Sequence, residues 1–263
     1  MTGPPTVPPA NYFAFIEGPV WIGSVGTGTL FFSDNASSPQ ERIFKLVPPS
    51  TTTTVFMEPS GSNGMAVDND DKLVVADQRN LRITQVDPVT GMTLKVIVPA
   101  GAYKPNDVLV RGDNNIYFTD PDTGFYRVAP SGTVTGPLKQ VNRPNGLALS
   151  PDENTLYVGD VGNKQIHKFA LASDGTVTVA SDMLFVTAMY DLVDGMCVDC
   201  AGNLYTGTSG GVEVYSPAGT NIGLIPSGLS SNCTFGGIDR KTIYITSAGL
   251  LKAATLNVPG LPD

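Results

Sequence analysis

One phrase occurs six times along the 263-residue chain. Each copy has a polar residue, usually followed by Gly, then a short apolar strand, a turn and a second strand. The copies start 38 to 49 residues apart, at Glu17, Asn63, Asn106, Asn145, Asp194 and Asn232. Repeats of about 40 residues that each contain a hairpin are typical of a β-propeller and not of a helical solenoid.

The repeat predicts an all-β fold, a six-bladed β-propeller with four antiparallel strands per blade. We expect a Pro-rich tail at 1–9 and a single propeller domain at 10–263. Residues Tyr12–Ile16 are expected to form the outermost strand of the last blade, so that both termini close the ring. A β-sandwich of similar strand content is the alternative, but it would not explain a sixfold phrase.

Charge and composition limit the partners. The net charge is -8 and no Lys/Arg-rich run occurs, so a nucleic-acid or anionic-membrane surface does not fit. No apolar run approaches the ~18 residues of a membrane span. The first ten residues lack the features of a signal peptide, and three cysteines are an odd count. We therefore expect a cytoplasmic monomer that acts on a small molecule.

The repeat also predicts a site. Equivalent positions of a rotational repeat lie on a ring around the axis, so the six leading polar side chains should face one another at the channel mouth. Two are carboxylates and four are carboxamides. Converging carboxylates favour a hard divalent ion such as calcium, with magnesium, manganese, zinc and iron as alternatives. The other interpretation is that the amides only hydrogen-bond the channel walls and water.

The phrases IEGPVW, KPNDVLV…IYFTDP, RPNGLALSPDENTLYV, VDGMCVDCAGNLY and NCTFGG resemble the SMP-30/gluconolactonase group. This group includes luciferin-regenerating enzyme and is related to the diisopropylfluorophosphatases. The resemblance implies a six-bladed propeller with one catalytic divalent metal, held by Glu17, Asn145 and Asp194. It also implies that Asn106 is a further ligand or an amide that orients the substrate.

The function expected from these residues is metal-dependent hydrolysis of a cyclic ester, foremost a sugar-acid lactone. Asp194 would act as general base on a water or as a direct nucleophile, and these alternatives stay open. Asn106 and Lys104 would hold the substrate ring, and Asp122 and Tyr126 would line the rim. The rival functions are a phosphotriesterase-like hydrolase and a non-catalytic calcium-binding or scaffold propeller.

Some details depart from the relatives or suggest other chemistry. Gln78 stands where many bacterial relatives have a His-Gly pair, and Lys104 stands where some lactonases have Arg. The single histidine, His167, excludes a His-rich zinc site. Aspartates recur at the ends of second strands, at Asp34, Asp77, Asp120 and Asp160, and this periodicity favours a structural role.

Overall fold

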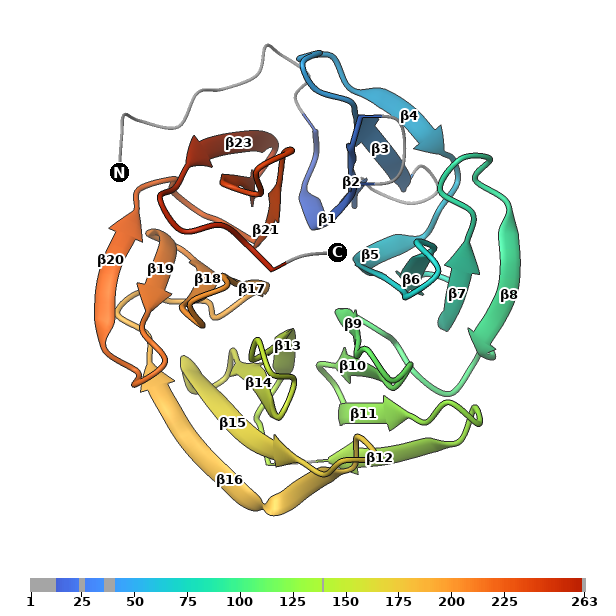
Figure 1. Ribbon diagram of the computed structural model, residues 1–263. Helices are drawn as coiled ribbons and strands as arrows, with labels where there is room; N and C mark the ends of the chain where they lie inside the picture. The colour runs from blue at the N-terminus through green and yellow to red at the C-terminus, as the bar shows by residue number, and fades with distance from the viewer. Residues whose placement is uncertain (1–12, 24–26, 36–40, 139, 262–263) are drawn as a thin grey trace.

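The computed structural model describes residues 13–23, 27–35, 41–138 and 140–261. Its strands form six antiparallel sheets arranged as blades around a central axis (Figure 1). The predicted all-β, six-bladed propeller is therefore confirmed. The described chain contains no helix long and apolar enough to cross a membrane.

Within each blade the chain runs outward, so the first strand lies nearest the axis and each strand pairs with the next. The first three blades consist of β1 (Ile16–Ile22), β2 (Thr29–Asp34), β3 (Arg42–Leu46) and β4 (Thr54–Met57); β5 (Ser62–Val67), β6 (Leu73–Asp77), β7 (Arg82–Val86) and β8 (Thr93–Val98); and β9 (Val108–Val110), β10 (Ile116–Asp120), β11 (Gly124–Val128) and β12 (Val134–Leu138). The other three consist of β13 (Pro144–Leu149), β14 (Thr155–Asp160), β15 (Gln165–Leu171) and β16 (Val177–Thr187); β17 (Met196–Val198), β18 (Leu204–Thr208), β19 (Gly211–Tyr215) and β20 (Asn221–Ile225); and β21 (Asn232–Gly236), β22 (Thr242–Ser247) and β23 (Leu250–Thr255).

The core is divided among the seams between blades. The described residues form six apolar clusters, and each cluster joins one pair of adjacent blades. Middle strands such as β2 and β6 are buried along their whole length because a neighbouring blade covers each face. At the seam between the last and first blades, Trp21 stacks on Tyr244 with ring centroids 5.8 Å apart. Each seam thus contributes its own share of the hydrophobic stabilisation.

The closure of the ring differs from the expectation for Tyr12–Ile16. The first residue of that range lies outside the described residues, as does the predicted tail at 1–9. The next three residues form no strand, and Ile16 begins the innermost strand of the first blade. Phe13 donates to the Gly249 carbonyl in the β22–β23 turn (3.2 Å), but Asp34 accepts the following two amides and holds the segment at the first blade. The last blade accordingly has three strands in the described chain.

Candidate metal centre

The six repeated polar residues lie where the innermost strands begin. Glu17, Asn63 and Asn145 are second residues of their strands, Asn232 opens its strand, and Asn106 and Asp194 stand two residues before theirs. These strands surround the central opening in Figure 1. The six side chains, here called the axial residues, therefore share one end of the channel, which we call the upper end.

Glycines that follow axial residues let neighbouring inner strands approach closely. A Cβ atom on Gly146 would lie 2.7 Å from Gly195 Cα and 2.9 Å from the Asp194 carbonyl carbon. A Cβ atom on Gly195 would overlap the Asn232 side chain, and one on Gly64 would lie 2.7 Å from Asp107 Cα. The recurrent Gly of the phrase is thus a packing requirement, because a side chain there would push the inner strands apart.

Three of the four periodic aspartates fix the segments that lead into axial residues, whereas Asp77 accepts the Asn80 amide (3.1 Å) and pairs with Arg82 (2.7 Å). Asp120 accepts the Lys104 amide (2.9 Å), two residues before an axial residue. Asp160 accepts the Asn142 amide in the same way (3.0 Å), and Asp34 accepts the amide of residue 14 (3.1 Å). All three carboxylates are buried. Their recurrence reflects this anchoring of the backbone, as the periodicity predicted, and they take no part in the axial cluster.

The fifth blade anchors its axial residue differently. Its second strand ends in Thr208, and the carboxylate comes from Glu213 on the next strand. Glu213 is fully buried and accepts the Met189 and Tyr190 amides (3.1 and 2.9 Å) as well as the Tyr215 hydroxyl. These bonds hold the segment that leads to Asp194. A carboxylate buried this deeply is stable there because its oxygens are satisfied.

Three carboxyl groups share the upper end of the channel. Burial raises the pKa of Asp194 to about 8, repulsion from Asp107 adds to the rise, and hydrogen bonding by Asn145 opposes it. Burial also raises the pKa of Glu17 well above its usual value, and repulsion from Asp194 and Asp107 adds to this effect. No ion pair within the described chain reaches any of the three carboxyl groups. Such a cluster favours either retained protons or a bound cation.

Asp107 was not among the residues that the sequence singled out. Its two carboxylate oxygens accept the backbone amides of Val108 (2.9 Å) and Leu147 (3.1 Å), and burial raises its pKa to about 7. It therefore lies between the inner strands of the third and fourth blades. The sequence did hold a signal, because four of the six phrases have Gly directly after the axial residue. A carboxylate at a position that is glycine in four phrases and Cys233 in the last one marks the exception.

The predicted substrate-binding residues have different placements. Lys104, expected to hold the substrate ring, and Asp122, expected to line the rim, are both exposed. Tyr126 is not on the rim: it is 3% exposed, and its ring packs against Phe118 and Tyr103 at centroid distances of 4.9 and 4.7 Å. The expectation for Tyr126 is corrected because successive residues of a strand point to opposite faces, and this one faces a seam.

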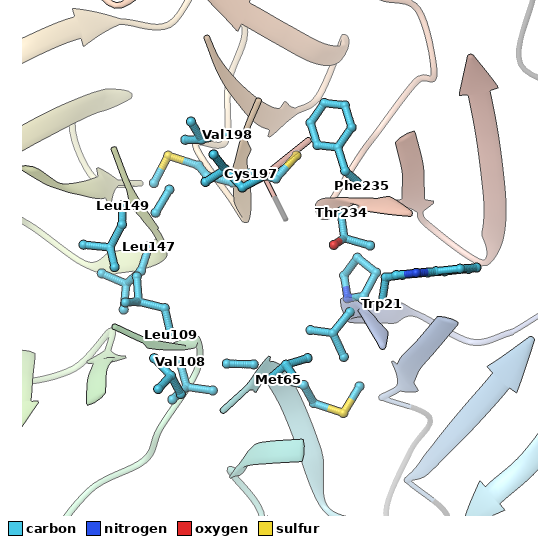
Figure 2. Close-up of a pocket in the computed structure, with 18 of the residues that line it drawn as sticks. Trp21, Met65, Val108, Leu109, Leu147, Leu149, Cys197, Val198, Thr234 and Phe235 are labelled. Atoms are coloured by element: carbon cyan, nitrogen blue, oxygen red, sulfur yellow. The ribbon is translucent and has the colours of Figure 1, made fainter. Parts of the chain in front are cut away.

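Beyond the axial residues the channel widens into a cavity of about 750 Å³. Its wall has an apolar part, and Figure 2 shows Trp21, Met65, Leu109, Leu147 and Phe235 around the open centre. Asp107 and Asn232 are the polar residues where this cavity adjoins the axial cluster. Asp68, Asp71, Glu153 and Arg240 also line the cavity, away from the axial cluster.

The donor set suits a hard divalent cation. Glu17 and Asp194 supply carboxylate oxygens, and Asn106 and Asn145 supply amide oxygens, which are the ligands that calcium and magnesium prefer. In the described chain no group of three or more His, Cys, Asp and Glu residues has the arrangement of a metal site. This result is compatible with the predicted set, since half of that set is amides. His167 is occupied elsewhere, by Asp182 at 2.7 Å.

Comparison with known proteins agrees with this architecture. The family described as the SMP-30/Gluconolactonase/LRE-like region matches residues 15–249. A gluconolactonase from Zymomonas mobilis is 33% identical over 91% of this chain and 78% of its own length. Pentonolactonase XacC from Haloferax volcanii is 26% identical over 89% of this chain and 81% of its own. The solved structure of XC5397 from Xanthomonas campestris, described as a gluconolactonase, superposes with a TM-score of 0.82 at 29% identity, covering 98% of this chain and 95% of that one.

The match covers all six blades and every axial residue, from Glu17 to Asn232. The family match therefore includes all six axial residues and is not confined to one blade or one motif. The chain belongs to the SMP-30/gluconolactonase/LRE-like family.

Proposed function

We propose that this protein hydrolyses a sugar-acid lactone with the help of one divalent cation, calcium foremost. The observation that carries the proposal is the convergence of Glu17 and Asp194, with Asp107 close by, at the upper end of the channel. A scaffold propeller has no need for repelling carboxylates on its axis. The lactonase relatives support the same reaction class, because they include a gluconolactonase and a pentonolactonase.

In this proposal Glu17, Asn145 and Asp194 hold the cation, and Asn106 is a further ligand or orients the substrate. The cation, when bound, would polarise the lactone carbonyl as a Lewis acid. Asp194 accepts a proton from the attacking water, or it attacks the carbonyl carbon itself to form a mixed anhydride that a water molecule later hydrolyses. The ring C–O bond then breaks, and the leaving oxygen takes up a proton to give the open hydroxy acid. Lys104 and Asp122 contact the hydroxyl groups of the sugar.

The test is metal analysis of the purified protein, combined with a lactone screen run with and without chelator. Hydrolysis of a neutral sugar lactone should disappear with chelator and return with a divalent cation. An organophosphate ester assayed in parallel distinguishes the phosphotriesterase-like rival. Full lactone turnover by protein shown to be free of metal would refute cation dependence, and faster turnover of the organophosphate would refute the substrate class.

A further inference from the structure

A second set of side chains surrounds the upper end of the channel, two residues before each axial residue. These six positions, here called the rim positions, are occupied by Phe15, Gly61, Lys104, Arg143, Leu192 and Ser230. The backbone supports their equivalence, since φ is left-handed at Gly61 (65°), Arg143 (58°) and Leu192 (66°). Because the blades repeat around the axis, the rim positions lie around the axial residues in the same rotational order.

Two neighbouring rim positions carry cations whose charges are not neutralised. Most Lys and Arg side chains of the described chain have an ion pair, a hydrogen bond or an aromatic ring as partner. Within the described chain the exceptions are Lys95, Lys104, Arg143 and Lys241. Lys104 and Arg143 are both exposed, and they belong to the adjacent third and fourth blades. In a chain of net charge -8, Lys104 and Arg143 thus place two cations without acidic partners on the rim around the axial cluster.

A hollow of about 550 Å³ lies beside these cations on the same face. Arg143 lines it together with Asp122 and Thr123 of the β10–β11 turn and Asn163 of the β14–β15 turn. Lys104 borders the same β10–β11 turn, because Asp120 accepts both the Lys104 amide (2.9 Å) and the Asp122 amide (3.0 Å). Arg143 and Asp122 line the hollow with opposite charges, and Lys104, which does not line it, lies beside the turn that carries Asp122. With Lys104 counted, two cations and one exposed carboxylate lie at this place.

We propose that Lys104 and Arg143 select lactones that carry an anionic substituent, a carboxylate or a phosphate, at the end of the molecule away from the ester. This inference rests on the proposed lactonase activity and adds the substrate class. The lactone carbonyl would face the axial residues, and the anionic group would enter the hollow. Arg143 suits this task because its planar guanidinium binds carboxylate and phosphate in a bidentate manner.

The test compares three lactones that differ only at one carbon: glucono-1,5-lactone and its counterparts with a carboxylate or a phosphate at C6. The parent protein should show a higher kcat/KM for one or both anionic lactones, and the two anionic arms distinguish carboxylate from phosphate. The preference should weaken as salt is added, because exposed charges are screened beyond ~10 Å at 0.1 M ionic strength.

Substitutions then assign the preference to residues. Arg143→Gln should lower the ratio of anionic to neutral kcat/KM about fivefold, the upper range for one exposed ion pair. Arg143→Gly is the second variant, because glycine adopts the left-handed φ at this position freely. Asp122→Asn should change the ratio in the opposite direction and raise it. Lys95→Gln is the matched control, since it removes an equally unpaired cation from the outer strand β8, and it should leave the ratio unchanged.

The outcomes separate this inference from the proposed function. Hydrolysis of glucono-1,5-lactone with no preference for either anionic lactone would overturn the inference and leave the lactonase activity standing. An equal fall for neutral and anionic lactones in Arg143→Gln, or the same change of ratio in Lys95→Gln, would also overturn it. If no lactone is hydrolysed, the proposed function fails. In that case, calorimetry with the ring-opened dicarboxylic acid tests whether Lys104 and Arg143 bind an anion in the absence of hydrolysis. Binding of this acid that does not weaken in Arg143→Gln would overturn the inference.

Discussion

The substitution Gly146→Ala tests how the inner strands position the metal centre. Gly146 has an ordinary φ, so alanine introduces no backbone strain of its own. Its new methyl group would overlap the Asp194 carbonyl oxygen and approach Gly195 Cα to 2.7 Å, so the fourth and fifth blades would have to separate by more than the ~0.7 Å that the Gly195 contact alone requires. That movement displaces Asn145 relative to Asp194. Overpacking of this kind costs about 1–3 kcal/mol of stability, and misplacement by ~1 Å can reduce turnover about 10²-fold.

The assay measures lactone turnover at saturating cation, cation affinity by calorimetry and the unfolding free energy in urea. Gly112→Ala is the control, because its methyl group would meet the end of the exposed Glu153 side chain at 3.0 Å, which can move aside. We expect Gly146→Ala to lose cation affinity and turnover while Gly112→Ala resembles the parent. If Gly146→Ala keeps both cation affinity and turnover, close approach of these strands is not what assembles the site.

Three further predictions concern the axial cluster and its anchors. Asp194→Asn should lower turnover by ~10²–10⁴ at saturating metal, and Asn63→Ala by about tenfold or less; the reverse order in proteins with matching far-UV spectra would contradict the assigned roles. Glu213→Gln should destabilise the fold by ~1–3 kcal/mol in urea titrations, because it disturbs acceptors for two buried amides; an unchanged midpoint would contradict this. Chelated protein should lose stability as pH rises. The folded pKa values of Asp194 (about 8) and Asp107 (about 7) exceed those of the unfolded chain, so the protonated forms stabilise the fold fully below about pH 4 and cease to do so above pH 8. Added calcium should abolish this trend in melting temperature, and a flat profile without metal would show that burial does not raise the pKa of these carboxyl groups.

The number of blades could be predicted from the sequence because every blade repeats the same short pattern: a polar residue, an apolar strand, a turn and a second strand. The strand that begins after Asn63 and the one that begins after Asn145 form for the same reason, an alternation of apolar residues bounded by turns. The axial positions followed from the repeat alone, since rotation places equivalent residues around one axis. The expectation for Tyr12–Ile16 failed because it came from ring closure and not from the repeat. Asp34, one of the periodic aspartates, accepts the amides of residues 14 and 15 and holds that segment at the first blade.

The residues that sequence reasoning missed are those that break the repeat. Asp107 occupies a position where most phrases have Gly, and Glu213 replaces an anchor that other blades carry at the end of the second strand. The burial of Tyr126 likewise depends on which neighbouring blade its strand faces. Periodicity describes what the blades share, whereas a catalytic site in a symmetric ring depends on their differences.

The division of the core explains why the axis can hold mutually repelling groups. Six separate apolar seams supply the stabilisation, so the axial residues need not contribute to it and can remain polar. At the same time the glycines beside Asn145 and Asp194 draw the inner strands together, which prevents Glu17, Asp107 and Asp194 from moving apart. Burial, which raises the pKa of all three groups, and the repulsion that adds to the rise for Glu17 and Asp194 are therefore held in place by packing elsewhere in the ring. A cation that neutralises this charge would stabilise the fold as it completes the site, so folding and cation binding should be coupled.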